Sequence, residues 1–294
     1  MRRALKRRNI MIFASEVPVI SALNPYRKIE DVFLNVWRRT NPRQVSALQQ
    51  SLALAVLPSQ EETMRAIVQD LGVAPAIAKL LEKASTADTI QQVAQAQAQV
   101  VHSLPSSTPT AVKSDVVQFV TSSMHKVFGA QHENAGIEAY EKKKRLVVHE
   151  RNVVFAKRQV EAHGPFAVFV GGKVDGRADG KVIEVKNRLK KFLSPLPKYD
   201  IAQLQTYLFI LGVQEGEIVE HLQAATTQTK MTPVAWDDKM WRTDIVPYLV
   251  RFSSALTYLM QDATVQKDYL QSDSAQQREI IRHLWSREVQ QTMP

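Results

Sequence analysis

The sequence predicts a mixed α/β fold, in which a β-sheet core is flanked by helices. Two β-rich runs, "FAVFVGGKV" and "KVIEVK", flank the turn dipeptide Asp179-Gly180, which is typical of a two-residue hairpin. Long segments on both sides of this hairpin have apolar residues at helical spacing. The chain of 294 residues is long enough for one large domain or two modest ones, and we interpret it as one.

The first third of the chain is predicted to be helical. Residues 8–44 form the expected N-terminal helical element, which includes a short helix capped by Ser15 and a longer amphipathic helix. Residues 45–110 are predicted to be a helical insertion, rich in Ala, Leu and Gln. It ends in a stretch with linker composition, "LPSSTPT".

Residues 111–225 are the predicted core of the domain, and residues 226–294 are predicted to be C-terminal helices. The expected elements of the core are, in order, a helix containing "MHKVFGAQHENAGIEAYEKK", strands at 145–156, 166–174 and 181–188, and a helix at 199–212 that Gly212 ends.

The hairpin register brings two acidic residues together. If Ala178 faces Lys181 across the turn, then Asp175 lies opposite Glu184, with their Cβ atoms roughly 5 Å apart. In the same register Lys173 lies opposite Lys186. Because side chains alternate along a strand, Glu184 and Lys186 share one face.

This arrangement suits phosphodiester hydrolysis. Two carboxylates this close repel each other unless one is protonated or a cation lies between them. Mg²⁺, for which Mn²⁺ could substitute, is commonly bound by one or two carboxylates with waters and phosphate. Lys186 would then orient or activate a water, or neutralise charge on the phosphate. A solvated surface hairpin is the alternative that these residues alone leave open.

Charge and composition favour a polyanionic partner that is bound through its phosphate backbone. The net charge is +9 and the pI is about 9.6, and basic residues cluster directly before and after the hairpin. Ordinary solvated lysines would give the same composition. With no cysteine, disulfides, thiolate zinc sites and cysteine-ligated iron–sulfur clusters are excluded.

The localisation expected from the sequence is soluble and intracellular. No apolar run is long enough to span a bilayer, and the N-terminus lacks the apolar region of a secretory signal. The first fifteen residues are basic and free of acids, which also fits a mitochondrial transit segment. We favour the first interpretation because these residues are assigned another role below.

Three polar residues lie on predicted helices of the core. Glu133 falls close to the buried stripe marked by Ile137 and Tyr140. Gln203 and Tyr207 are one turn apart and share a face. On an apolar helix such a pair is also compatible with a core hydrogen bond.

Together these residues resemble the PD-(D/E)XK nucleases. Asp175, the "IEVK" run and the glutamine–tyrosine helix match the pattern of the RecB-like branch. "FGAQHENA" resembles the Gly-x-x-x-Glu-Asn helix of the lambda-type exonucleases, or YqaJ-like viral recombinases, and "FASEVPVISALNPY" resembles their N-terminal segment. The four motifs span residues 8 to 207 in the family's order, whereas residues 45–118 have no evident counterpart.

The resemblance implies a restriction-endonuclease-like core, a central mixed sheet flanked by helices. It implies a Mg²⁺-dependent 5′→3′ exonuclease that acts on duplex DNA ends in recombination, repair or viral replication. A single-strand annealing protein is the implied partner, and a homo-oligomer that encloses DNA is the implied assembly. A viral origin would place the protein in the cytoplasm or nucleus of a host cell.

Residue roles follow from the same resemblance. It implies that Glu133, Asp175 and Glu184 are metal ligands. Lys186 would orient or activate the attacking water, Gln203 would hold that water or the scissile strand, and Tyr207 would pack beside it.

The implied DNA contacts are distributed around this centre. Arg8 and Ser15 would bind the 5′-terminal phosphate, and further contacts would come from Lys173, Arg188, Lys190 and Lys191. The chain departs from the family pattern where Val174 replaces proline and Lys173 replaces a small hydroxyl residue. No arginine follows the lysine motif at the family's spacing, so Lys190 or Lys191 would substitute for it.

Three alternatives stay open at this point. The first is a structure-specific or single-strand endonuclease of the same superfamily. The second is a DNA-binding or recombination-mediating protein that has lost catalysis. The third is an interaction protein built around residues 45–104, which would bind a protein partner and show no metal dependence.

Overall fold

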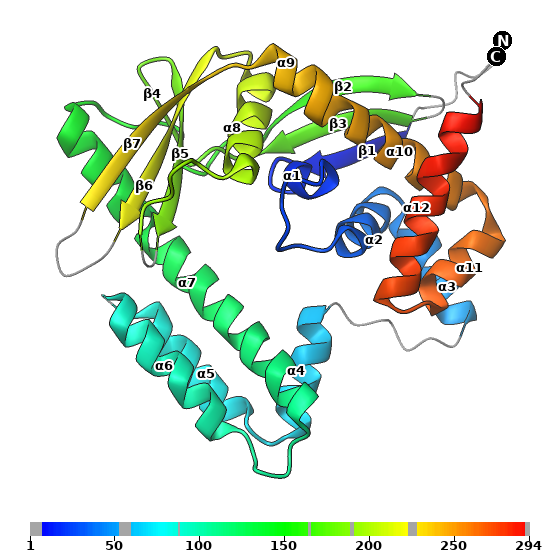
Figure 1. Cartoon of the computed structure of the whole chain (residues 1–294), viewed down its shortest axis with the longest axis horizontal. Coiled ribbons are helices and arrows are strands. Elements are labelled where there is room, and N and C mark those ends of the chain that lie inside the picture. Colours follow the sequence, from blue (N-terminus) through cyan, green and yellow to red (C-terminus); the bar gives the residue numbers. More distant parts are fainter. Residues whose placement is uncertain are drawn as a thin grey trace.

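A computed structural model describes residues 8–52, 60–87, 89–163, 166–188, 191–222 and 228–291. It confirms the predicted mixed α/β class, with helices around two β-sheets (Figure 1). The elements follow in this order: β1 (Arg8–Phe13), α1 (Val17–Ile20), α2 (Ile29–Thr40), α3 (Pro42–Ser51), α4 (Gln60–Asp70), α5 (Ala74–Ser85), α6 (Ile90–Ser103), α7 (Thr110–Lys144), β2 (Ala156–His163), β3 (Phe166–Gly172), β4 (Gly176–Ala178), β5 (Lys181–Arg188), α8 (Lys198–Leu211), β6 (Glu215–Leu222), β7 (Gln228–Ala235), α9 (Asp238–Met240), the π-helical turn η1 (Trp241–Ile245), α10 (Val246–Gln261), α11 (Ala263–Gln271) and α12 (Ser274–Gln291).

Both sheets combine parallel and antiparallel pairs. The first has the strand order β1-β3-β2, with β1 parallel and β2 antiparallel to β3. The second has the order β4-β5-β6-β7, in which only β5 and β6 are parallel. Helix α8 makes the crossover between β5 and β6, as a parallel pair requires. The chain from β3 to α8 carries the hairpin residues Asp175, Glu184 and Lys186 and the helix residues Gln203 and Tyr207 of the predicted site.

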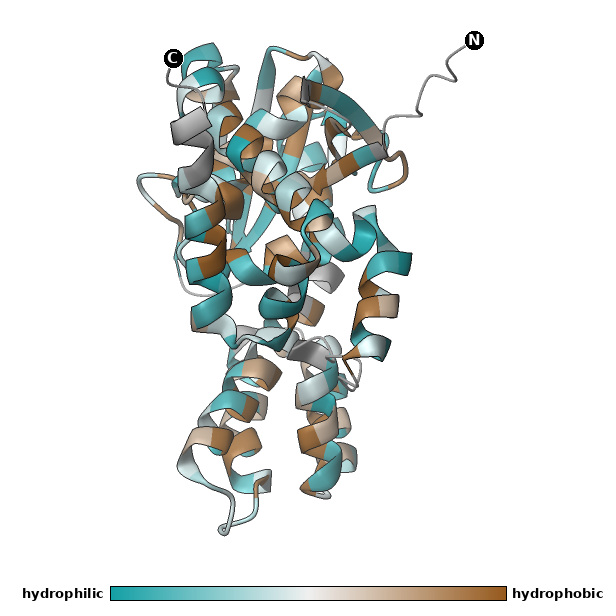
Figure 2. Cartoon of the chain, turned by 90° about the vertical axis from the view of Figure 1, so that its right-hand side faces the viewer, coloured by the Kyte–Doolittle hydropathy of each residue, from teal (hydrophilic) through white to brown (hydrophobic). Residues whose placement is uncertain are grey.

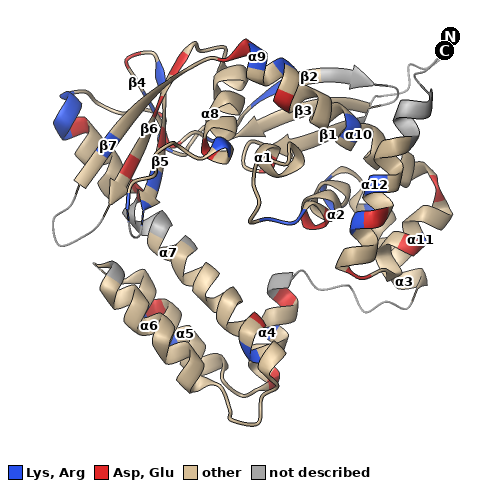
Figure 3. Cartoon of the chain, in the orientation of Figure 1, with Lys and Arg blue, Asp and Glu red and all other residues tan. Residues whose placement is uncertain are grey.

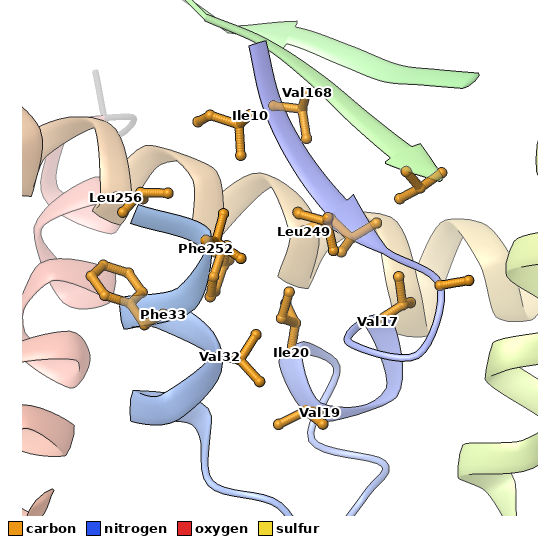
Figure 4. Packing of buried hydrophobic residues seen from close by; sticks show 14 of the residues in the cluster. Ile10, Val17, Val19, Ile20, Val32, Phe33, Val168, Leu249, Phe252 and Leu256 are labelled. Atoms are coloured by element: carbon orange, nitrogen blue, oxygen red, sulfur yellow. The ribbon is translucent and has the colours of Figure 1, made fainter. Parts of the chain in front are cut away.

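The main hydrophobic core lies between the first sheet and the helices α1, α2, α8 and α10–α12. Figure 4 shows Ile10 of β1 and Val168 of β3 above Ile20, Phe33 and Phe252, which come from α1, α2 and α10. Helix α12 contributes Ile281 and Leu284 to this core, so the C-terminal tail is packed rather than peripheral.

A separate helical arm is built from α4, α5, α6 and the first half of α7 (Figure 1). Its buried cluster runs from Val68 to Phe128, and apolar and hydrophilic segments alternate along its helices in Figure 2. The predicted boundary at residue 110 is therefore wrong. "LPSSTPT" is a turn inside the arm, because α6 and α7 pack against each other on both sides of it.

The second half of α7 packs on the second sheet. Ile137 and Tyr140 are buried against Ile183 and Val185 of β5. A Cβ atom at Gly136 would lie 2.6 Å from Val185 Cγ1, so only glycine allows this close an approach of helix and strand. The contact holds the preceding turn of α7, which carries Glu133, beside β5.

Several predicted boundaries are corrected by the structure. The N-terminal element begins with a strand, β1, which pairs with the distant strand β3, and the C-terminal part begins with β7, which pairs with the preceding strand β6. Residues 145–155 form no strand, although they contain four valines: Glu150 and Asn152 have positive φ, and Val153 and Val154 are exposed. Ser15 is not a helix cap, since α1 is preceded by Glu16 without a side-chain capping bond.

Among the described residues, no helix combines the length and the apolar character needed to cross a membrane.

Candidate active site

The predicted hairpin forms in the predicted register. Asp179 and Gly180 have φ values of 50° and 73°, and Ala178 pairs with Lys181 across the turn. Counted from the turn, the ladder ends at the pair Gly176 and Ile183, which is one pair short of the predicted pair of Asp175 and Glu184. Asp175 still lies against β5, because its Oδ2 accepts a hydrogen bond from the Val185 N–H at 2.8 Å.

Glu184 and Lys186 occupy the same face of β5. Lys186 Nζ donates to Glu184 Oε1 at 2.7 Å and to Gln203 Oε1 of α8 at 3.1 Å. Glu184 is buried, and its other oxygen, Oε2, is shielded from solvent without a hydrogen-bond partner. A buried carboxylate oxygen left in this way is costly unless a cation or water completes it.

Helix α8 brings Gln203 and Tyr207 to the same place. Tyr207 shares a side-chain hydrogen bond with Gln203, and its ring lies against the end of β3. A Cβ atom at Gly172 would be 2.9 Å from that ring, so the glycine makes room for it. Burial, followed by the charges of Glu184 and Asp175, raises the pKa of Tyr207, which therefore stays a neutral phenol.

The carboxylate from α7 completes the group. Glu133 is partly exposed, and its Oε1 accepts a hydrogen bond from Asn152 Nδ2 at 2.5 Å. Burial and the charge of Glu184 raise the pKa of Glu133. Burial and the charges of Glu184 and Glu133 raise the pKa of Asp175 well above its usual value. The three carboxylates thus belong to one electrostatic site.

The charges of this site do not balance without a cation. Six side chains form a continuous ion-pair network in which three positive charges meet three negative ones: Lys186–Glu184 at 2.7 Å, Lys186–Asp200 at 3.8 Å, Arg188–Asp200 at 2.8 Å, Arg188–Glu220 at 2.8 Å and Lys230–Glu220 at 3.5 Å. Glu133 and Asp175 add two negative charges, and within the described part of the chain neither belongs to an ion pair. When both carboxyls are ionised, two net negative charges therefore remain, and the raised pKa values of Glu133 and Asp175 oppose that state unless a cation is bound.

A divalent ion with oxygen ligands fits this excess charge. The free oxygen of Glu184 and the repelled carboxyl of Asp175 supply the hard ligands that Mg²⁺ prefers. Over the described ranges, no three acidic, histidine or cysteine side chains are already spaced to hold an ion by themselves. Mg²⁺ is commonly held by one or two carboxylates together with waters, which is the number of oxygen ligands that Asp175 and Glu184 offer.

Arg188, predicted as a DNA contact, belongs to the ion-pair network. Its guanidinium donates to Asp200 and to Glu220, each at 2.8 Å, and the side chain is only 12% exposed. The network around it was missed from the sequence. Asp200 lies one turn before Gln203 on α8, and this spacing was the one available signal for it.

The other predicted DNA contacts are not brought together. Lys173 and Lys191 are exposed near the site, whereas Lys190 lies outside the described residues. Ser15 is exposed, and it follows the end of β1 that pairs with Gly171. Arg8 begins the same strand, whose six residues span about 17 Å, so its backbone lies far from Ser15.

No protein-family model matches this chain, and no curated protein matches it either. Among solved structures it is similar to LHK-Exo, an alkaline exonuclease from Laribacter hongkongensis, with 18% identity over 57% of this chain and 92% of that chain and a TM-score of 0.36. LHK-Exo in complex with dAMP gives 17% identity over 64% and 96% of the two chains, with a TM-score of 0.35. The structure of SSO0001 gives 17% over 52% and 70%, with a TM-score of 0.34. Because these values are low, the proposed function rests on the residues of the site.

Proposed function

We propose that this protein is a Mg²⁺-dependent deoxyribonuclease, and that it degrades duplex DNA from its ends in the 5′→3′ direction. The observation that supports this best is the meeting of Asp175, Glu184 and Lys186 at a site with two excess negative charges. A surface hairpin with solvated charges would bury neither Glu184 nor the network behind it.

Asp175 and Glu184 would hold the metal, with Glu133 completing the shell from α7. When bound, Mg²⁺ supplies positive charge that stabilises the phosphate as negative charge builds on it. Glu184 can serve two purposes at once, because Lys186 uses Oε1 and leaves Oε2 for the ion.

Lys186 acts as a cation in this scheme. Although burial opposes its charge, Glu184, Asp200 and Asp175 raise the pKa of Lys186 to about 12. It is therefore protonated at neutral pH, so it orients the attacking water as a hydrogen-bond donor or neutralises the phosphate. Gln203 Oε1 accepts a hydrogen bond from the ammonium, and the Gln203 side chain is held in turn by a hydrogen bond with Tyr207, which fixes the ammonium in place.

Exposed lysines beside the site would bind the phosphate backbone of the DNA. Lys173 precedes Asp175 by two residues, and Lys191 follows β5. Figure 3 shows that Lys and Arg occur around the second sheet, whereas α6 of the arm carries no charged residue. Such contacts bind phosphates without reading sequence, as expected of an enzyme that degrades DNA progressively.

One digestion experiment separates the possible activities. The substrates are a linear duplex with a 5′ phosphate on one strand only and a covalently closed circle, each with Mg²⁺ or EDTA. We expect Mg²⁺-dependent loss of the phosphorylated strand while the circle stays intact. Cleavage of the circle would show an endonuclease instead, and no cleavage of either substrate would contradict the proposal. Asp175→Asn is the inactive control.

A further inference from the structure

The segment 148–152 ties helix α7 to β4, the strand that directly follows Asp175. On the helix side, Glu141 Oε1 accepts hydrogen bonds from the Val148 N–H at 2.7 Å and from Arg151 Nη2 at 2.5 Å. On the strand side, the backbones of His149 and Arg177 exchange two hydrogen bonds of 2.8 Å. We call residues 148–152 the strap.

Asn152, at the end of the strap, contacts both sides of the site. Its backbone N–H donates to the carbonyl of Val174, the residue before Asp175, at 3.0 Å. Its side-chain Nδ2 donates to Glu133 Oε1 at 2.5 Å. One residue therefore links Glu133 of α7 to the backbone of the β3–β4 connection, next to Asp175.

The backbone of Asn152 is set for this double contact. Its φ is +51°, a left-handed conformation that asparagine adopts more readily than most residues because its side chain is short and polar. Residues held in such conformations cluster at functional sites, where the surrounding structure determines them. Here the paired hydrogen bonds between His149 and Arg177, with that of the Asn152 N–H to Val174, hold it in place.

Glu133 needs such a partner. It is partly exposed on a helix and is repelled by Glu184, so it would otherwise turn away from the other carboxylates. The Asn152 amide attracts it and uses only one of its two oxygens. The other oxygen stays available as a ligand.

We propose that Asn152 is a positioning residue that presents Glu133 to the divalent metal ion, an inference that rests on the proposed function. In this role Asn152 would act through Glu133, with which its side chain shares a hydrogen bond. Groups that hold a metal ligand in this way typically contribute 10- to 100-fold to metal affinity or activity.

The variant Asn152→Gly tests this inference. Glycine accepts the left-handed backbone and keeps the N–H bond to Val174, so only the amide is lost. Mn²⁺ binding is measured by calorimetry without DNA, alongside kcat and the Mg²⁺ dependence of cleavage. We expect N152G to weaken Mn²⁺ binding by about tenfold or more. The matched control is Glu141→Ala, which removes the other tie of the strap and should leave Mn²⁺ affinity unchanged.

A double-mutant cycle makes the test specific to Glu133. In a Glu133→Gln background, adding N152G should change Mn²⁺ affinity by less than about twofold, because the group that Asn152 positions is already altered. Unchanged Mn²⁺ affinity in N152G, or an equal loss in E141A, would overturn the inference while leaving the proposed function intact. A wild-type protein that neither binds Mn²⁺ nor cleaves DNA would overturn both.

Discussion

The substitution Asp175→Asn should stabilise the protein while abolishing its activity. The amide keeps the shape of the side chain, and its oxygen can still accept the hydrogen bond from Val185. What is lost is one of the two charges that no ion pair balances. The perturbation therefore separates the electrostatic cost of the site from its packing.

The size of the effect follows from the expected spacing of the two carboxylates. If Asp175 and Glu184 keep the roughly 5 Å of cross-strand neighbours, they repel each other by about 3 kcal/mol at an effective dielectric constant of about 20. Lys186 offsets part of this repulsion. In EDTA we therefore expect the free energy of unfolding of D175N to exceed that of the wild type by about 1–3 kcal/mol. Cleavage in Mg²⁺ should fall by about a thousandfold, which corresponds to about 4 kcal/mol of barrier.

The pH dependence of the stability difference between D175N and the wild type provides a second test of its sign. Because the folded-state pKa of Asp175 is raised, its contribution to stability is fully present below the unfolded pKa and is lost as the pH rises from there through the folded value. At lower pH the wild-type carboxyl is protonated, and the difference from D175N should vanish. Urea unfolding in EDTA at pH 8 and at pH 4 measures both limits. A D175N protein that is equally or less stable than the wild type at pH 8 would refute the reasoning.

Three further outcomes are expected. Gly136→Ala should lose about 1–3 kcal/mol of stability together with activity, because the clash with Val185 exceeds the helix-propensity gain of about 1 kcal/mol; a thermally unchanged variant would contradict the close approach of α7 to β5. Glu30→Gln should lose about 1–2 kcal/mol at pH 7, since hydrogen bonds from Arg278 and Ser274 overcome burial and lower the pKa of Glu30. The stability that Glu30 contributes is present above its unfolded pKa and is lost as the pH falls through its folded pKa, so denaturant titrations near pH 3 should show no difference between E30Q and the wild type. The exposed Glu279→Gln is the control and should leave the free energy of unfolding unchanged. DNA affinity measured by fluorescence anisotropy should fall steeply between 50 and 200 mM salt, and a flat response would mean that the lysines do not follow the backbone.

The hairpin could be predicted from the local sequence pattern alone. The dipeptide Asp179-Gly180 determines the turn, the turn determines the register, and alternation then places Glu184 beside Lys186. Helix α8, with its end at Gly212, was predictable for the same reason. Each of these features depends on residues close together in the chain.

The errors share the opposite cause. Residues 145–155 have strand composition, but their backbone is held by Glu141 and Arg177 in turns that no local rule indicates. From the sequence Arg188 looks like a surface cation, but in the structure its guanidinium donates hydrogen bonds to both Asp200 and Glu220. The same stretch of basic residues therefore mixes structural and exposed groups.

Residue types and spacing were sufficient for the α/β class, the hairpin and the set of acidic and basic residues that suggests nuclease chemistry, because turn formation and side-chain alternation act over a few residues. Only the tertiary structure decided that α7 approaches β5 at Gly136 and that Arg188 is ion-paired within the buried network. It also decided that Asn152 joins Glu133 to the backbone next to Asp175. These contacts join elements far apart in the chain, and their geometry depends on packing, which no local pattern encodes.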